Sequence, residues 1–103
     1  AGPLADFPVD RVYDQFREQG FFVIRRNGKL YAMSSVCTHK GCKVRPQEDL
    51  SYLCKCHKSR FDAEGRVVNP PARRDLPRLA VAVNEEQHLL VNLARHVDRS
   101  VAF

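Results

Sequence analysis

Two short segments rich in cysteine and histidine constrain the fold of this chain more than any other feature. One runs from Cys37 to Cys42 and the other from Cys54 to Ser59; the Cys-x-His of the first recurs as Cys-x-x-His after fourteen intervening residues. Thiolates and imidazoles are ligands of zinc and of iron–sulfur clusters. A chain of 103 residues buries only a modest core, so a metal centre that pins two loops adds useful stability. The sequence predicts a fold built around two ligand loops.

The residues before these segments predict a helix and a β-hairpin. Apolar and polar residues near helical spacing, followed by a glycine, indicate a short helix over Asp10–Gly20. Phe21–Arg26 and Lys29–Ser34 are rich in β-prone residues and are separated by Asn27-Gly28, the strongest short hairpin signal. We therefore expect an antiparallel pair directly before the first ligand segment.

The middle of the chain predicts very short strands and turns. Leu50–Leu53 is a β-like run between the two ligand segments. Asp62–Gly65 is typical of a turn, Val67–Val68 of a short strand, and Asn69–Ala72, with two prolines, of a rigid loop that cannot join a sheet. One strand is thus expected to lie between two ligand loops.

The end of the chain predicts a second hairpin. Leu79–Val83 and His88–Leu93 are the expected strands, whereas residues 95–103 show no pattern and are expected to form a tail. Many short strands at close spacing favour a mainly β chain of small antiparallel sheets. We expect a single domain over residues 1–103, with a ligand-binding subdomain over about 36–72.

Composition excludes several classes of function. The net charge of +5 comes from basic residues interrupted by acidic ones, and the chain has no tryptophan, which disfavours nucleic-acid binding. No run of about eighteen apolar residues is present, and the first residues lack the pattern of a signal peptide. We expect no membrane segment and no nucleic-acid partner.

The donor types alone leave three metal centres open. A zinc site with two cysteines and two histidines uses the same donors at comparable spacing and leaves two cysteines unused. A four-cysteine cluster would use Cys37, Cys42, Cys54 and Cys56 and leave both histidines unused. The third candidate is an iron–sulfur cluster with mixed cysteine and histidine ligands.

The two segments resemble the two boxes of the Rieske family. The resemblance implies a two-iron, two-sulfur cluster, with Cys37 and Cys54 on one iron and His39 and His57 on the other. In the respiratory branch of that family the cysteines that match Cys42 and Cys56 form a disulfide, so this interpretation gives all six residues a role. Two ferric ions, two sulfides and two thiolates carry no net charge, whereas an all-cysteine cluster is a dianion. The neutral cluster therefore accepts an electron more easily than the dianion. Rieske centres have reduction potentials of about −150 to +300 mV, against about −400 mV for plant-type ferredoxins.

The resemblance covers about residues 21–93 and reaches beyond the ligands. Ser59 matches the family's serine that donates a hydrogen bond to a bridging sulfide. Phe61 stands where respiratory members often have a tyrosine that donates to a ligand sulfur, so we expect a potential below that of the highest-potential members. Asn69–Ala72 matches the proline loop that covers the cluster.

The resemblance also implies a compartment. A disulfide between Cys42 and Cys56 favours the periplasm or another oxidising compartment; reduced thiols at these positions would leave the cytoplasm as the alternative.

The chain departs from the quinol-oxidising members at the tips of the loops. Those members usually have leucine, proline and glycine at the positions of Lys40, Lys55 and Lys58. Ammonium groups are costly to bury in an apolar quinol pocket, so direct quinol chemistry is disfavoured. A basic rim instead favours docking to an acidic redox partner. The rim consists of Lys40, Lys43, Arg45, Lys55, Lys58 and Arg60.

The resulting prediction is an electron-transfer protein that is not itself an enzyme. It would carry single electrons to a protein partner through one 2Fe-2S cluster. The alternatives are the head of a Rieske subunit from a cytochrome bc-type or arsenite-oxidase-like complex and, third, a zinc-stabilised interaction domain. His88 and His96 lie outside both boxes and are expected to be structural or exposed.

Overall fold

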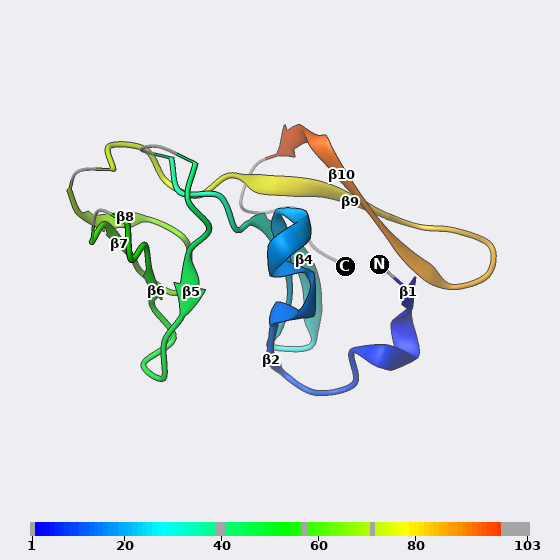
Figure 1. Cartoon of the computed structure of the whole chain (residues 1–103). Helices are drawn as coiled ribbons and strands as arrows, with labels where there is room; N and C mark the ends of the chain where they lie inside the picture. Colours follow the sequence, from blue (N-terminus) through cyan, green and yellow to red (C-terminus); the bar gives the residue numbers. More distant parts are fainter. Residues whose placement is uncertain (1, 39–40, 57, 71, 98–103) are drawn as a thin grey trace.

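The computed structural model describes residues 2–38, 41–56, 58–70 and 72–97, and its strands form two antiparallel sheets (Figure 1). The larger sheet has the spatial order β1 (Gly2–Pro3), β10 (His88–Val97), β9 (Arg78–Val83), β4 (Lys29–Ser34), β3 (Phe21–Arg26) and β2 (Arg11–Tyr13). The smaller sheet has the order β5 (Arg45–Pro46), β6 (Tyr52–Leu53), β7 (Arg60–Phe61) and β8 (Val67–Asn69). The prediction of a mainly β chain of small antiparallel sheets is confirmed.

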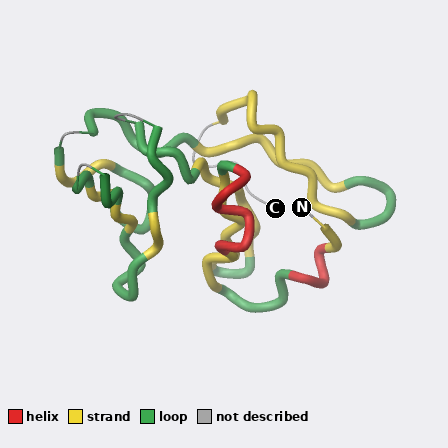
Figure 2. The backbone as a smooth tube through the Cα atoms, viewed as in Figure 1, coloured by secondary structure: helices red, strands yellow, loops and turns green. Residues whose placement is uncertain are grey.

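The two sheets lie at opposite ends of the molecule, and loops predominate around the smaller one (Figure 2). Two short 3-10 helices, η1 (Leu4–Asp6) and η2 (Asp14–Gln19), accompany the larger sheet. No helix in the described part of the chain is long and apolar enough to cross a membrane.

The hairpin formed by β3 and β4 is confirmed in full. Its strands pair from Phe21 opposite Ser34 to Arg26 opposite Lys29. Asn27 and Gly28 both have positive φ angles, 52° and 76°, which matches the right-handed twist of the strands. The Asp10 carboxylate accepts hydrogen bonds from both of their backbone N–H groups, which fixes the turn.

The helix predicted over Asp10–Gly20 is only partly correct. Arg11–Tyr13 forms strand β2, whose Val12 lies opposite Ile24 of β3, and only Asp14–Gln19 is helical, as a 3-10 helix. Pairing with the edge of the sheet satisfies backbone groups and buries Tyr13, which outweighs a weak local helical pattern. Gly20 ends the helix in the left-handed conformation, as expected.

Three other boundaries differ from the prediction. Leu50 lies in a turn, and β6 begins only at Tyr52. Asn69 pairs with Arg60 as the last residue of β8, so only the residues after it leave the sheet. The hairpin of β9 and β10 is confirmed, but β10 continues to Val97, so residues 95–97 are strand; the remainder of the predicted tail lies outside the described residues.

Both faces of β3 are buried, and each face belongs to a different core. Phe21 and Val23 pack into a cluster within the larger sheet, together with Phe7, Leu79 and Leu89. The alternate residues of β3 face the opposite way and join the second cluster, which spans the two sheets. Phe22 contacts Tyr52 of β6 with ring centroids 5.2 Å apart.

The second cluster also contains Cys37 and Cys54. The apolar contact that joins the two sheets therefore continues directly to both of these cysteines.

Candidate metal centre

The first predicted ligand loop follows β4 and is closed by its own backbone. The Cys37 N–H donates to the Cys42 carbonyl (2.6 Å), and the Cys37 carbonyl accepts from the Gly41 N–H (3.0 Å). An isolated bridge between Val36 and Lys43 closes the base of the loop. Cys37 is thus held, with its side chain buried, at the foot of a tight loop.

The second loop follows β6 and repeats the same backbone pattern. The Cys54 N–H donates to the Ser59 carbonyl (2.9 Å), and the Cys54 carbonyl accepts from the Lys58 N–H (2.7 Å). Gly41 and Lys58, each four residues after the first cysteine of its loop, both have positive φ, 81° and 60°. The chain therefore builds one ligand loop twice from different sequences.

A disulfide joins Cys42 to Cys56 and ties the two loops together. Cys37 and Cys54 lie outside the disulfide and are buried. The Sγ of Cys54 lies within 4.8 Å of both disulfide sulfurs, so the second loop is packed closely against the first. Because disulfide sulfurs are not thiolates, this sulfur group is not itself a ligand set.

The segment after β8 is bonded to both loops. The Thr38 hydroxyl donates to the Arg74 carbonyl (2.5 Å), and the fully buried Ser59 hydroxyl accepts from the Ala72 N–H (3.0 Å). The hydroxyl oxygen is the acceptor in this hydrogen bond, so the hydroxyl can still donate its proton to another group. This segment includes the predicted proline loop, and Pro71 lies outside the described residues.

Sequence reasoning missed Arg17 of η2. Its Nε and Nη2 atoms donate to the carbonyls of Val44 (2.7 Å) and Lys43 (3.0 Å), and its own carbonyl accepts from the Ser35 hydroxyl. Arg17 thereby holds the first loop against the larger sheet. An arginine in a short helix carries no sequence signal for such a role.

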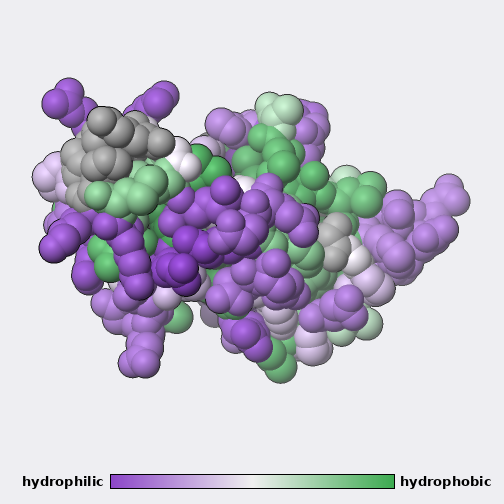
Figure 3. Space-filling model, in the orientation of Figure 1, coloured by the Kyte–Doolittle hydropathy of each residue, from purple (hydrophilic) through white to green (hydrophobic). Residues whose placement is uncertain are grey.

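The rim around the two loops is basic. Lys55 and Lys58 are exposed, and hydrophilic residues cover much of the smaller sheet in the view of Figure 3. Within the described residues, none of the rim cations forms a salt bridge; this set is Lys43, Arg45, Lys55, Lys58 and Arg60. Lys40 lies outside the described residues. A cavity of about 380 Å³ opens between this rim and η2, beside the disulfide.

The predicted site residues are brought together as far as they are described. Cys37, Cys54 and Ser59 lie at the feet of the two facing loops, and the predicted disulfide is formed. His39 and His57 lie outside the described residues. His96 is exposed and lines a cavity of about 480 Å³ with Cys37 and Thr38, while His88 is half-buried in β10.

These residues fit an iron–sulfur cluster. Two buried cysteines lie outside the disulfide, one in each of two matching loops, and the buried Ser59 hydroxyl at the end of the second loop can donate its proton. A two-loop, disulfide-linked cysteine site on small antiparallel sheets defines a metal-cluster-binding protein of the β class.

Comparison with known proteins identifies the family. The family model of the Rieske [2Fe-2S] domain matches residues 4–92. The chain therefore belongs to the Rieske family, and its cofactor is a 2Fe-2S cluster.

The similar proteins agree with this assignment. The chain is 38% identical over 88 residues to the cytochrome bc1 complex Rieske iron-sulfur subunit of Corynebacterium efficiens, covering 82% of this chain and 21% of that protein. It is 30% identical over 96 residues to the cytochrome b6-f complex iron-sulfur subunit of Chlorobaculum tepidum, covering 90% of this chain and 52% of that protein. The chain thus spans about a fifth to a half of these relatives.

A solved structure is similar over nearly its whole length. The cyanobacterial plasma membrane Rieske protein of Synechocystis matches with a TM-score of 0.58 and 28% identity, covering 88% of this chain and 95% of that one.

Proposed function

We propose that this chain is a one-electron carrier whose cluster is held by Cys37 and Cys54 on one iron and by His39 and His57 on the other. The observation that carries the proposal is the pair of matching loops, joined by a disulfide, each with one buried cysteine outside that disulfide. When bound, the cluster supplies a centre that accepts and returns one electron. We also propose that residues 1–103 form one domain, which the core shared by both sheets supports.

The protein's own residues would hold and shield this centre. Burial of Cys37 and Cys54 keeps water from the thiolate ligands. Ser59, fixed by the Ala72 N–H, would donate its hydroxyl proton to a sulfide, which favours the reduced state. Phe61 is fully buried and has no hydroxyl to add a second donor, which lowers the potential relative to members with tyrosine.

The ligand set is tested by spectroscopy and elemental analysis. The reduced protein should show a rhombic electron paramagnetic resonance signal, with two irons and two acid-labile sulfides per chain. Cys37→Ser and His39→Ala should each abolish the signal, whereas His88→Ala, in β10 and outside both loops, should leave it unchanged. Stoichiometric zinc without iron would overturn the assignment.

We further propose that the basic rim docks an acidic protein partner. The rim cations beside the disulfide give this end of the molecule a positive field that would steer an acidic surface toward the loops. The exposed Lys55 and Lys58 would be costly to place in an apolar quinol pocket.

Electron transfer to an acidic redox protein should slow as salt is raised. Lys55→Gln should lower the bimolecular rate at low salt, whereas Lys29→Gln, an exposed lysine at the turn of β3 and β4, should not. Equal effects of the two substitutions would show that only net charge matters.

A second candidate is the cluster-bearing part of a subunit in a quinol-oxidising complex. Its support is limited to the names of the bc1 and b6-f relatives, of which this chain spans 21% and 52%. Reduction of the cluster by a quinol in the purified complex, absent with the isolated chain, would support it.

In both cases we propose an oxidising compartment such as the periplasm, because the disulfide persists there.

A further inference from the structure

The cavity between η2 and the two ligand loops is lined mainly by cations. Its volume is about 380 Å³, and its basic lining residues are Arg17, Lys43, Arg45 and Lys55. Among the described residues that line it, only Glu18 is acidic. Hydrophilic residues cover the surface between η2 and the smaller sheet in Figure 3. The cavity therefore presents four cations against one carboxylate.

The carboxylate of Glu18 is bound only at the surface. Its Oε1 atom lies 2.6 Å from Nη1 of Arg17, and the Glu18 side chain is 78% exposed whereas that of Arg17 is 17% exposed. Surface ion pairs of this kind contribute about 0–1 kcal/mol. The other two donors of Arg17 are fixed on the carbonyls of Lys43 and Val44. Another carboxylate can therefore replace Glu18 on an arginine that is already oriented.

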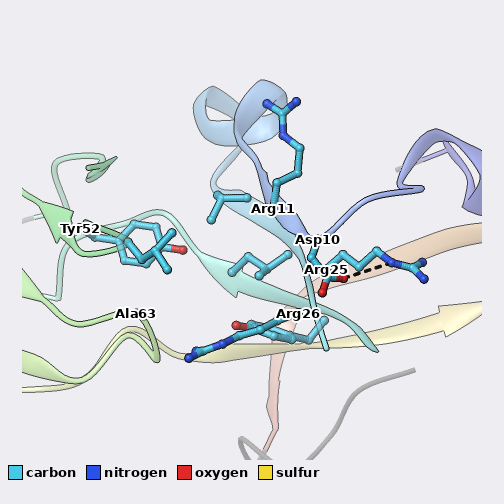
Figure 4. A pocket seen from close by; sticks show the side chains of 10 residues that line it. Asp10, Arg11, Arg25, Arg26, Tyr52 and Ala63 are labelled. Carbon is cyan, nitrogen blue, oxygen red and sulfur yellow. Dashed lines mark ion pairs between the residues drawn. The ribbon is translucent and has the colours of Figure 1, made fainter. Parts of the chain in front are cut away.

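The arginines where the two sheets meet are arranged differently (Figure 4). There Arg25 lies 3.4 Å from the Asp10 carboxylate, and Arg26 forms an ion pair with Glu64. In the cavity beside the disulfide, the three basic residues other than Arg17 form no salt bridge with a described residue. Because like charges repel one another, this second group of cations favours an anion supplied from outside the chain.

The cavity lies next to one of the proposed ligands. Cys42 and Cys56 form part of its wall, and the Sγ atoms of both lie within 4.8 Å of the Sγ of Cys54. A negative charge placed in the cavity would therefore act on the cluster over a short distance, through a partly buried path that solvent screens poorly. Binding of an anion and reduction of the cluster should consequently influence each other.

We propose that this cavity is the point at which the acidic partner docks, and that it binds a segment with two or more neighbouring carboxylates, one of which replaces Glu18 on Arg17. This inference rests on the proposed electron-carrier function. The volume of the cavity falls within the roughly 300 to 1,000 Å³ of sites that hold whole small molecules, so it has room for more than one carboxylate side chain.

The test uses hexaglutamate as the probe, titrated into the oxidised holoprotein by calorimetry at low ionic strength. The peptide should bind saturably at one site per chain. Inorganic phosphate at the same ionic strength should bind at least about tenfold more weakly, because it cannot engage several cations with linked carboxylates. Absence of saturable peptide binding, or equal affinities for the two anions, would overturn the proposal.

Two glutamates that are matched in charge separate a defined site from net charge. Glu18→Gln should tighten hexaglutamate binding by about threefold, because the competing carboxylate is gone while the loop contacts of Arg17 are kept. Glu86→Gln, an exposed glutamate in the turn between β9 and β10, changes net charge equally and should leave the affinity unchanged. Equal tightening by the two substitutions would refute the site.

Arg17→Gln should weaken hexaglutamate binding by about tenfold, since charged hydrogen bonds are lost. Unchanged affinity in a folded Arg17→Gln protein would contradict the role of this residue. If the variant does not fold, the pair of glutamate substitutions decides.

The reduction potential gives a second measurement. The reduced cluster carries one more negative charge, so hexaglutamate should bind the reduced protein about threefold more weakly than the oxidised protein. Linkage then requires the potential to fall by about 30 mV at saturating peptide, and an unchanged potential would contradict a site beside the cluster. The calorimetric test does not depend on redox chemistry. Absence of peptide binding would therefore overturn this site and leave the electron-carrier proposal standing, whereas absence of the paramagnetic resonance signal would overturn the carrier proposal.

Discussion

Replacing Gly65 by alanine should loosen the contact between the two sheets. Gly65 has a φ of 83°, and a Cβ there would lie 2.5 Å from the Sδ of Met33 and 3.2 Å from the Cβ of Leu76. Met33 is fully buried in the core that joins the sheets, so the clash cannot be relieved by moving a side chain into solvent. Overpacking typically costs about 1–3 kcal/mol and left-handed backbone in a non-glycine residue about 1–2 kcal/mol. We expect a total loss of about 2–5 kcal/mol.

Gly28→Ala is a matched control for this substitution. Gly28 also has a positive φ, 76°, but a Cβ added there would have no atom within 4 Å, so alanine adds backbone strain alone. Unfolding in urea, followed by cluster absorbance and by circular dichroism, gives the two free energies. The loss for Gly65→Ala should exceed the loss for Gly28→Ala by about 1–3 kcal/mol, which is the cost of the contact between the added Cβ and Met33. Equal losses at the two glycines would refute the inferred contact.

Three further predictions concern the loops and the core. Lys58→Gly should be about 0.5–1 kcal/mol more stable in urea than Lys58→Ala, since both lose the charge but only glycine relieves the φ of 60°; equal stabilities would contradict this. Replacing Cys42 and Cys56 together by alanine should lower the free energy of unfolding by about 3 kcal/mol, as expected for a disulfide that closes a loop of this length. An unchanged midpoint of unfolding in urea would show that the disulfide does not stabilise the fold. Burial raises the pKa of Tyr52, so the folded protein keeps a phenol proton that the unfolded protein loses above about pH 10. The contribution of Tyr52 to stability should therefore be constant below that pH and fall above it. Unfolding measured at about pH 8 to 11 should show a smaller loss of stability in Tyr52→Phe, and equal losses in the two proteins would contradict this.

The parts of the fold with strong local signals could be predicted from sequence. Asn27-Gly28 between two β-prone runs defined its hairpin to the residue, because these two residue types favour the positive φ angles that the turn requires. Arg11–Tyr13 could not be predicted, because its strand depends on pairing with β3 rather than on its own residues. The continuation of β10 to Val97 likewise depends on its partner Arg78.

The site was predictable where chemistry requires a residue type. Cys37 and Cys54 could be proposed as ligands because few side chains bind iron, and the Cys42–Cys56 disulfide followed from the family resemblance. Arg17 was not predictable, because its contacts are to backbone carbonyls that any sequence provides. The contact of Phe22 with Tyr52 depends on how the two sheets meet, which no local pattern specifies.

The bracing of the two loops has a consequence for the speed of electron transfer. The loops are restrained from several directions. The disulfide joins them to each other, and hydrogen bonds tie Thr38 to Arg74, Ser59 to Ala72, and Val44 to Arg17. Loops that are held rigidly before an electron is transferred move little when the cluster is oxidised or reduced. The reorganisation energy contributed by the protein should therefore be small, so exchange can be fast even with a partner of nearly equal potential.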